Sequence, residues 1–251
     1  MIGPLRLLID LGNSRLKWAL ESPKGLDRCD SAAHEGGVCS ALLSVVDATA
    51  PQSIWLSSVA GPAGDRLAAQ LSQRSGAPIH RARSVALIDG IRNAYAEPER
   101  LGVDRFLTLL GARQRFPNQA LLIVDAGTAL TVDLLDRDGR HLGGSIAPGL
   151  MLMRRSLGRG TASLGASDQP PPVALTSWGR DTVSAIEGGI LAAAHGAIAL
   201  RLSQAAALDP RLLLTGGDAA LLAQDFADAA HLPQLVLEGL QRYAELTESG
   251  D

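Results

Sequence analysis

The chain has 251 residues, of which 46% are hydrophobic and 20% charged, so it can bury a large core and is not disordered as a whole. Its formal net charge is −3 and only 3% of its residues are aromatic, so it lacks the positive field and stacking surfaces of a nucleic-acid-binding protein. Cys29 and Cys39 have neither metal-ligand nor disulfide spacing, which predicts reduced thiols in a cytosol.

The first half of the chain opens on a predicted pair of strands. An apolar run ends at Asp10, turns at Gly12 and Asn13, and returns as a second strand over residues 16–20. The pattern then predicts, in order, a buried strand over 53–58, a helix over 63–75, a short strand over 79–81, and a helix that begins near Pro98 and ends before Pro117.

The second half begins in the same way. Strands are predicted over 120–125 and 129–135, with a turn at Gly127 between them, and Asp138-Gly139 is a good turn into a further strand over 142–146. The composition then predicts, in order, an irregular loop over 159–172, the longest helix over 181–204, a strand over 211–215, a glycine turn at 216–217, and a helix from 219.

The two halves share a repeated motif. Leu8-Ile9-Asp10-Leu11-Gly12-Asn13-Ser14 and Ile123-Val124-Asp125-Ala126-Gly127-Thr128-Ala129 each place an apolar strand before Asp-x-Gly and then continue into a second apolar strand. The two aspartates lie 115 positions apart, close to half the chain. This duplication predicts two related lobes, which we divide as residues 1–116 and 117–251.

An Asp-x-Gly turn at the end of a strand brings backbone N–H groups and a carboxylate to one edge, which suits a phosphate and its metal ion. A single copy is more often an ordinary hairpin, because Asp and Gly both favour turns. Two copies with matching strands make phosphate binding the better interpretation. The later turn at Gly216-Gly217 permits close approach of a flat ligand such as adenine.

Together these turns resemble the paired ATPase lobes of the actin, sugar kinase and Hsp70 superfamily, and within it the chain resembles the type III pantothenate kinases, also called the Bvg accessory factor family. The resemblance implies an α/β protein of two ribonuclease H-like lobes, with ATP bound between them. Ser14 stands where the family commonly has Thr, which keeps the hydroxyl. The matching segments run from Asp10 to Lys17, Asn93 to Tyr95, Leu101 to Arg105, Asp125 to Asp133, Gly143 to Gly149, and Gly179 to Gly189.

The resemblance implies that the enzyme transfers the γ-phosphate of ATP to the 4′-hydroxyl of pantothenate, giving 4′-phosphopantothenate in the first step of coenzyme A biosynthesis. The family motif Gly-x-Asp-Arg, here Gly102-Val103-Asp104-Arg105, assigns the role of catalytic base to Asp104. An alcohol is a poor nucleophile at neutral pH, so the reaction gains from a carboxylate that accepts the hydroxyl proton. Read without the family, Asp104 is a first-turn helix acid, Arg105 a surface salt bridge and Tyr95 a core side chain. The implied pantothenate-binding residues are Tyr95, Gly102, Val103, Asp104, Arg105 and Thr182.

The same resemblance implies the ATP and cation sites. Asp10 would hold Mg²⁺ through water, and Asp125 would bind a monovalent cation, K⁺ or NH₄⁺. Lys17 is one of only two lysines and is either a point charge beside phosphate or a solvated strand-edge residue. The implied ATP-binding residues are Asp10, Leu11, Gly12, Asn13, Ser14, Arg15, Leu16, Lys17 and Thr128.

The partners expected are pantothenate, ATP and, from the family, a second copy of the chain in a homodimer. Asp125, Asp133, Glu187 and His195 interrupt the apolar runs, which predicts no membrane span and a cytoplasmic protein. Two alternatives stay open: another small-molecule kinase of the superfamily, and a nucleotide-sensing accessory protein that acts on transcription through a partner. We assign His195 no role and treat Asp133 and Asp218 as plausible polar neighbours of the nucleotide.

Overall fold

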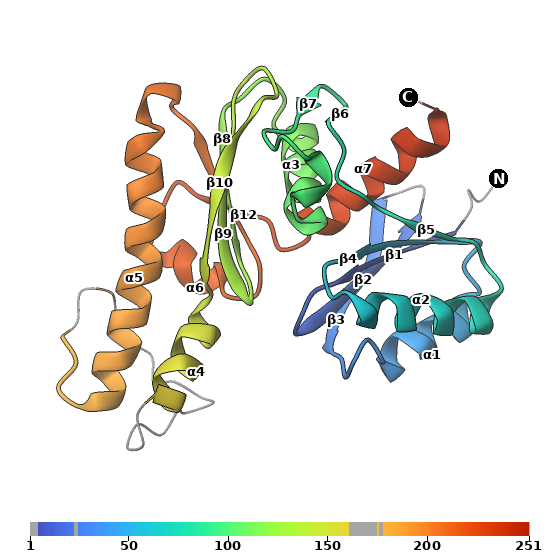
Figure 1. Ribbon diagram of the computed structural model, residues 1–251, viewed down its shortest axis with the longest axis horizontal. Helices are drawn as coiled ribbons and strands as arrows, with labels where there is room; N and C mark the ends of the chain where they lie inside the picture. The colour runs from blue at the N-terminus through green and yellow to red at the C-terminus, as the bar shows by residue number, and fades with distance from the viewer. Residues whose placement is uncertain (1–4, 23–24, 161–174, 176–177, 251) are drawn as a thin grey trace. The chain divides into compact units, whose positions relative to one another are not determined.

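The computed structural model describes residues 5–22, 25–160, 175 and 178–250 (Figure 1). The chain forms two compact units. Unit 1 comprises Met1–Asn118, Asp138–His141 and Gln234–Asp251, and unit 2 comprises Gln119–Arg137 and Leu142–Pro233. The first boundary lies two residues beyond our expected division at 116/117, whereas the C-terminal segment, which we had assigned to the second lobe, packs within unit 1.

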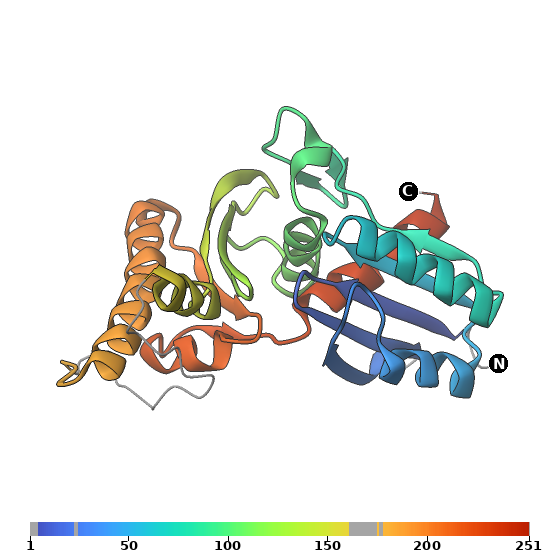
Figure 2. The ribbon, with the colours of Figure 1, turned by 60° about the horizontal axis from the view of Figure 1, so that its bottom comes forward.

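Unit 1 is built on a five-stranded sheet in the order β3-β2-β1-β4-β5, in which β1 pairs antiparallel with β2 and parallel with β4. Helices α1 and α2 cover one face, and α7 lies on the other (Figures 1 and 2). Because both faces are covered, β1 is a nearly continuous apolar run with Leu7, Leu8 and Ile9 fully buried. The elements are β1 (Arg6–Leu11), β2 (Arg15–Ser22), β3 (Gly25–Ala33), α1 (Ser40–Thr49), β4 (Ser53–Ser58), α2 (Pro62–Ser75) and β5 (Ile79–Arg81).

The C-terminal helix α7 (Leu235–Ser249) joins unit 1 through its packing on α3 (Val103–Arg115). A Cβ atom on Gly239 would lie 1.9 Å from the Leu107 carbonyl oxygen, so only glycine permits this approach of the two helix backbones. At the edge of the contact, Arg115 Nη1 lies 2.6 Å from Glu238 Oε1. Helix α7 therefore stabilises α3, the helix that begins at the Gly-x-Asp-Arg motif.

Unit 2 repeats this architecture. Its sheet has the order β10-β9-β8-β11-β12, so each strand has a counterpart at the same place in unit 1. β8 is antiparallel to β9 and parallel to β11, as β1 is to β2 and β4. A core of buried aliphatic side chains from β8, β9, β11 and α5 fills the space between sheet and helices. The elements are β8 (Leu121–Ala126), β9 (Ala129–Leu135), β10 (His141–Pro148), α4 (Leu150–Gly160), α5 (Thr182–Gln204), β11 (Arg211–Thr215), α6 (Ala219–Leu222) and β12 (Ala230–His231).

Shorter elements connect these. The helix predicted from Pro98 is a 3₁₀ turn over Pro98–Arg100 followed by α3, because Leu101 and Gly102 have extended backbone dihedrals that separate the two. Of the irregular loop predicted over 159–172, residues 159–160 end α4, and 161–172 lie outside the described residues. A two-stranded hairpin of β6 (Leu87–Ile88) and β7 (Ile91–Arg92) precedes the 3₁₀ turn, and further 3₁₀ turns span Ala206–Leu208 and Ala223–Asp225.

Helix α5 begins at a capping box in which Asp181 accepts from the Ser184 N–H, a local signal that agrees with the predicted start. By length and composition alone α5 is apolar enough to cross a membrane, and 28% of its most apolar window is buried in the structure. We had expected Glu187 to interrupt such a run. Glu187 is instead buried within the helix, and the cost of burying its charge is offset because Arg154 of α4 pairs with both of its carboxylate oxygens.

Candidate functional site

The N-terminus of α3 fixes the Asp104 carboxylate. Gly102 is the N-cap residue, and Asp104 Oδ1 accepts a hydrogen bond of 2.8 Å from the Arg105 backbone N–H. A Cβ atom on Gly102 would lie 2.6 Å from the same Oδ1 atom. Glycine at 102 therefore leaves the space that the carboxylate occupies, and the Gly-x-Asp-Arg spacing sets where Asp104 lies.

Arg105 and Tyr95 form a pair beside this carboxylate. The Arg105 side chain is only 5% exposed, and its Nη1 donates to the Tyr95 hydroxyl oxygen over 3.0 Å. The guanidinium carbon also lies 5.8 Å from the centre of the tyrosine ring. The alternative of a surface salt bridge at Arg105 is therefore wrong, since the group is buried.

Two residues that the sequence interpretation missed hold Tyr95 in place. Asn93 Oδ1 accepts from the Tyr95 N–H over 3.0 Å, and Asn93 Nδ2 donates to the Pro98 carbonyl oxygen. The buried His141 ring stacks on the Tyr95 ring, with the ring centres 6.3 Å apart and the planes 10° from parallel. Asn93 stands in the recognised Asn-Ala-Tyr segment, whereas no local pattern links His141 to a tyrosine 46 positions earlier.

The β1–β2 hairpin of unit 1 carries the predicted phosphate-binding residues. Asp10 is 8% exposed, and its Oδ1 accepts a 2.9 Å hydrogen bond from the Ser57 hydroxyl of β4. The hairpin closes where the Gly12 N–H donates to the Arg15 carbonyl oxygen over 3.0 Å. Lys17 lies opposite Asp10 in the β-sheet register.

The side chains of this hairpin divide into two groups. Leu11 and Leu16 are fully buried in the core of unit 1, so they can contact ATP only through their backbone. Asn13, Ser14 and Arg15 are exposed at the tip. The core residues thus anchor the hairpin, and the polar residues are the ones that can reach a ligand.

The equivalent hairpin of unit 2 carries Asp125. Its neighbours in register are Thr131 on β9 and Thr215 on β11, the strand that ends at the Gly216 turn. Gly216 has a φ of +95°, and a Cβ atom there would lie 2.4 Å from Asp125 Oδ1. A side chain at 216 would therefore displace the carboxylate proposed to hold a cation. The predicted ATP contact Thr128 is exposed, next to the Gly127 turn.

Charge in unit 2 gathers where α4 approaches this glycine turn. Asp218 follows Gly216-Gly217, and its N–H donates to the Ala126 carbonyl oxygen over 2.9 Å. Burial raises the pKa of the Asp218 carboxyl, and the nearby Arg154 guanidinium opposes the shift. The Arg154 guanidinium therefore interacts electrostatically both with its partner Glu187 and with Asp218 beside the Gly216-Gly217 turn.

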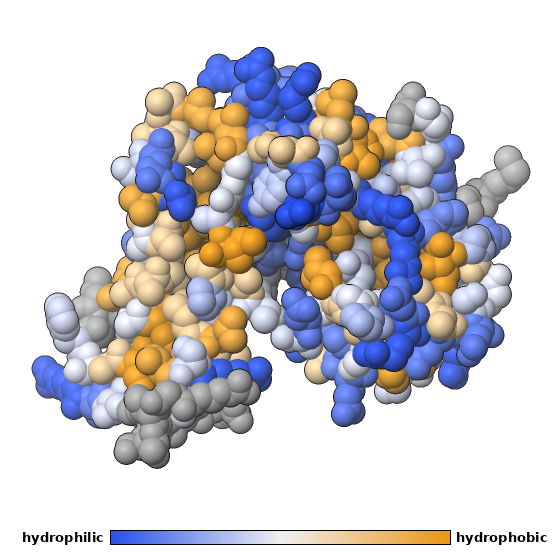
Figure 3. All heavy atoms as spheres, viewed as in Figure 1, coloured by the Kyte–Doolittle hydropathy of each residue, from blue (hydrophilic) through white to orange (hydrophobic). Residues whose placement is uncertain are grey.

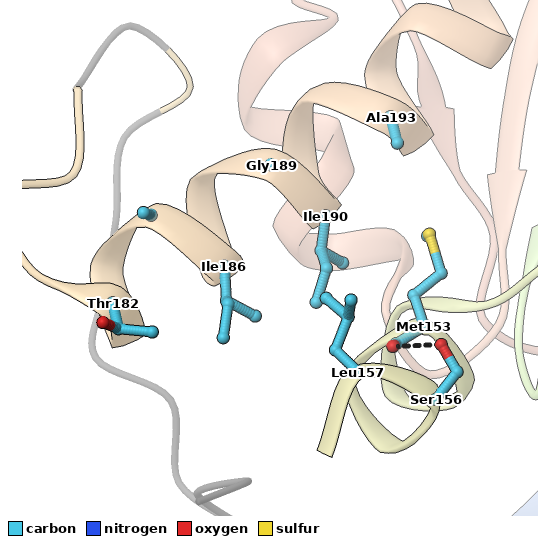
Figure 4. Close-up of a pocket in the computed structure, with 9 residues that line it drawn as sticks. Met153, Ser156, Leu157, Thr182, Ile186, Gly189, Ile190 and Ala193 are labelled. Atoms are coloured by element: carbon cyan, nitrogen blue, oxygen red, sulfur yellow. Dashed lines mark hydrogen bonds between the residues drawn. The ribbon is translucent and has the colours of Figure 1, made fainter. Parts of the chain in front are cut away.

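Thr182, the remaining predicted pantothenate residue, lies in unit 2 at the start of α5. It borders a pocket of about 660 Å³ between α4 and α5, and its side chain and those of Ile186 and Leu157 are drawn around this space in Figure 4. The other predicted pantothenate residues belong to unit 1. The pocket is lined by Met153, Ser156, Leu157, Thr182, Ala185, Ile186, Gly189, Ile190 and Ala193.

The two candidate cation-binding carboxylates, Asp10 and Asp125, lie on separate hairpins, so each can supply one protein ligand to its own cation. Within the described part of the chain, no group of three or more His, Cys, Asp or Glu side chains is arranged to hold a metal ion. Mg²⁺ on a nucleotide usually keeps several waters and takes one or two protein carboxylates. Asp10 and Asp125, each at the end of a strand beside a tight turn, fit that pattern.

The sequence model of the type III pantothenate kinase family matches residues 6–203. The chain belongs to this family. A type III pantothenate kinase from Halorhodospira halophila is 40% identical over 252 residues, which cover 96% of this chain and 98% of the relative. The family phosphorylates pantothenate with ATP in coenzyme A biosynthesis. The resemblance inferred from the Asp-x-Gly and Gly-x-Asp-Arg motifs is thereby confirmed.

Solved structures confirm the fold class. A conserved putative Baf family transcriptional activator from Campylobacter jejuni aligns with a TM-score of 0.65 at 22% identity, over 97% of this chain and 99% of the other. A putative 2-dehydro-3-deoxygalactonokinase from Sinorhizobium meliloti aligns with a TM-score of 0.63 at 17% identity, over 96% and 98%. With the duplicated sheet order, these likenesses establish two ribonuclease H-like lobes of the actin, sugar kinase and Hsp70 type.

The two contacts of the Tyr95 side chain can be separated by substitution. Tyr95→Phe keeps the ring that stacks on His141 but removes the acceptor of the Arg105 guanidinium. If Arg105 binds pantothenate as the family motif implies, we expect the KM for pantothenate to rise roughly tenfold with a much smaller change in kcat, because the hydrogen bond that orients Arg105 is lost. Steady-state kinetics at saturating ATP measure this, and an unchanged KM would show that Tyr95 does not orient Arg105.

Proposed function

We propose that this protein transfers the γ-phosphate of ATP to the 4′-hydroxyl of pantothenate, giving 4′-phosphopantothenate and ADP. The observation that carries the proposal is the buried Arg105–Tyr95 pair beside the Asp104 carboxylate, in a chain of this family. A guanidinium presents several N–H donors in a fixed fork, a geometry that suits the carboxylate of pantothenate. In this proposal Asp104 accepts the proton of the attacking hydroxyl.

The hairpin residues Asp10 to Lys17, together with Thr128, are proposed to bind ATP. The tip residues Asn13, Ser14 and Arg15 are exposed and belong to the tight turn that Gly12 and Arg15 close, an arrangement that suits phosphate oxygens. Mg²⁺, held by Asp10 through water, would neutralise charge on the phosphates. Asp125 would bind K⁺ or NH₄⁺, and its proximity to the Gly216 turn supports a role near the nucleotide.

Gly102, Val103 and Thr182 are also proposed to bind pantothenate. Gly102 and Val103 are half-buried at the start of α3, next to Asp104. Thr182 is exposed at the start of α5 and borders the α4–α5 pocket. We assign it to pantothenate on the family motif, and the polar hydroxyl at the edge of an apolar pocket suits a small polar substrate with an apolar backbone.

A homodimer is proposed from the surface of α4 and α5. Apolar side chains gather over these helices in Figure 3, and Leu152, Leu157, Val183 and Leu200 are each at least 39% exposed. Exposed apolar side chains that gather on one pair of helices favour a partner, and we propose a second copy of the chain as that partner. A sedimentation experiment that gave only monomer at micromolar protein would exclude this arrangement.

The test of the activity is ATP-dependent formation of 4′-phosphopantothenate by the purified protein with Mg²⁺, in the presence and absence of K⁺. We expect turnover by the wild type to require K⁺, and we expect the rate of Asp125→Ala to be the same with and without K⁺. A panel of sugars and sugar acids with ADP readout tests the alternative kinase. A nucleotide-sensing accessory protein would bind ATP without consuming pantothenate. Absence of product from the folded wild type would reject the proposed reaction.

A further inference from the structure

The tip of the β1–β2 hairpin is contacted by a histidine from another part of unit 1. His34 follows β3, and its ring Nε2 lies 2.9 Å from the Gly12 carbonyl oxygen. The other ring nitrogen, Nδ1, accepts a 3.1 Å hydrogen bond from the Gly37 N–H. One imidazole thus joins the turn between β3 and α1 to the hairpin proposed to bind phosphate.

These two contacts determine the state of the ring. A backbone N–H can only donate, so Nδ1 must be the unprotonated acceptor. A neutral imidazole then carries its proton on Nε2, which donates to the Gly12 carbonyl oxygen. The histidine is therefore a donor of defined direction toward the hairpin.

The turn that carries His34 is itself held in place. Arg66 of α2 donates from Nε to the Gly36 carbonyl oxygen over 2.9 Å. Within the turn, the backbones of Glu35 and Val38 exchange hydrogen bonds of 3.2 and 3.0 Å. The turn that carries His34 is consequently fixed against α2, and this fixes the position from which Nε2 reaches Gly12.

The contact to Gly12 orients one peptide group of the hairpin. The Gly12–Asn13 peptide bond is trans. In a trans peptide the C=O and the following N–H point in opposite directions. When the Gly12 carbonyl is bound to His34, the N–H of Asn13 must therefore point away from His34. The Gly12 N–H is committed separately, to the Arg15 carbonyl oxygen. Both peptide groups that flank Gly12 thus have defined orientations.

We infer that His34 is a positioning residue for ATP: it holds the Gly12–Asn13 peptide so that the Asn13 N–H donates to a phosphate oxygen. The inference rests on the proposed role of the hairpin in ATP binding. The His34 ring itself does not touch the nucleotide. Its contribution is to remove the freedom of one peptide plane, which would otherwise have to be ordered when ATP binds.

Two substitutions separate the two hydrogen bonds of the ring. In His34→Gln the amide nitrogen replaces Nε2 as a donor to Gly12, whereas in His34→Asn the shorter carbonyl replaces only Nδ1 as the acceptor from Gly37. We expect the Kd for a non-hydrolysable ATP analogue with Mg²⁺ to stay within about twofold of wild type in His34→Gln. In His34→Asn it should rise roughly five- to tenfold, as for one lost hydrogen bond.

Titration calorimetry measures these affinities, and kinetics should show the same rise in the KM for ATP with little change in kcat or in the KM for pantothenate. His80→Asn is the matched control, since His80 lies in the same unit, where its ring stacks on Trp55. Melting temperatures close to wild type would confirm that both His34 variants fold. Equal ATP affinity of the two variants, whether normal or weakened, would overturn the inference.

A further variant distinguishes failure of this inference from failure of the proposed ATP site. Gly12→Val places a branched side chain at a position where even a Cβ atom lies 3.2 Å from the Arg15 carbonyl oxygen. If Gly12→Val weakens ATP binding while both His34 variants bind normally, the hairpin binds ATP and His34 has no part in it. If Gly12→Val also binds ATP normally, the hairpin is not the phosphate site, and both proposals are wrong on that point.

Discussion

Asp104→Asn is expected to lower kcat for pantothenate phosphorylation by about 100-fold or more, because a carboxamide cannot accept the proton of the attacking hydroxyl. The substitution is close to isosteric, and the asparagine carbonyl can still accept the Arg105 N–H that now binds Asp104 Oδ1. The start of α3 should therefore keep its geometry. The KM for ATP and the melting temperature are expected to stay near the wild-type values.

Asp65→Asn is the matched control for Asp104→Asn. Asp65 is also a first-turn acid, in α2, and its partner is the exposed Arg81. If the loss of charge at a helix N-terminus were the whole effect of Asp104→Asn, the two variants would behave alike, with a change in stability of up to about 1 kcal/mol. Near-normal kcat in Asp104→Asn would show that Asp104 is a structural acid.

Glu187→Ala is expected to lower the free energy of unfolding by about 3 to 5 kcal/mol, the range for leaving one member of a buried ion pair without its partner. Arg154 Nε and Nη2 lie 2.6 and 2.5 Å from the two carboxylate oxygens of Glu187, and both side chains are less than a tenth exposed. Removing Glu187 leaves the buried Arg154 guanidinium without its hydrogen-bonded carboxylate, and the electrostatic interaction with Asp218 then remains to oppose its charge. Denaturant unfolding of the purified protein measures the loss.

The double variant Arg154→Met with Glu187→Met decides the cause. Two apolar side chains of similar length remove both buried charges, so we expect much of the lost stability to return. Asp47→Ala, which breaks the exposed pair with Arg74, should change stability far less because water already solvates both groups. If the double variant is as unstable as Glu187→Ala, packing volume and not the unpaired charge causes the loss.

Much of the fold could be predicted where the signal is local. The strand over Ser53–Ser58 and the short strand Ile79–Arg81 agree with the prediction to the residue, and α5 begins one residue after the expected Asp181. Alternation of apolar residues and a capping side chain act within a few positions, so a single segment contains them. The duplicated Asp-x-Gly hairpin was visible for the same reason.

Other elements, β3 and α7 among them, were not predicted. β3 has a half-exposed pattern that gives no clear alternation, whereas α7 has apolar residues at helical spacing that we did not interpret as a helix. The return of α7 to unit 1 depends on Gly239 fitting against Leu107, more than 130 positions earlier in the chain. A glycine in a helix does not by itself reveal what approaches it.

The same distinction between local sequence signals and tertiary contacts applies to the candidate site. The sequence by itself determined the order of the motifs and the resemblance to the family, because both depend on residue types at short spacing. The candidate roles of Asp104 and Asp125 followed only from that resemblance. Only the tertiary structure decided that Arg105 is buried against Tyr95 and that His34 reaches Gly12. Burial and hydrogen-bond direction are properties of atoms that meet across tens of residues, and packing of the sheets and helices brings those atoms together.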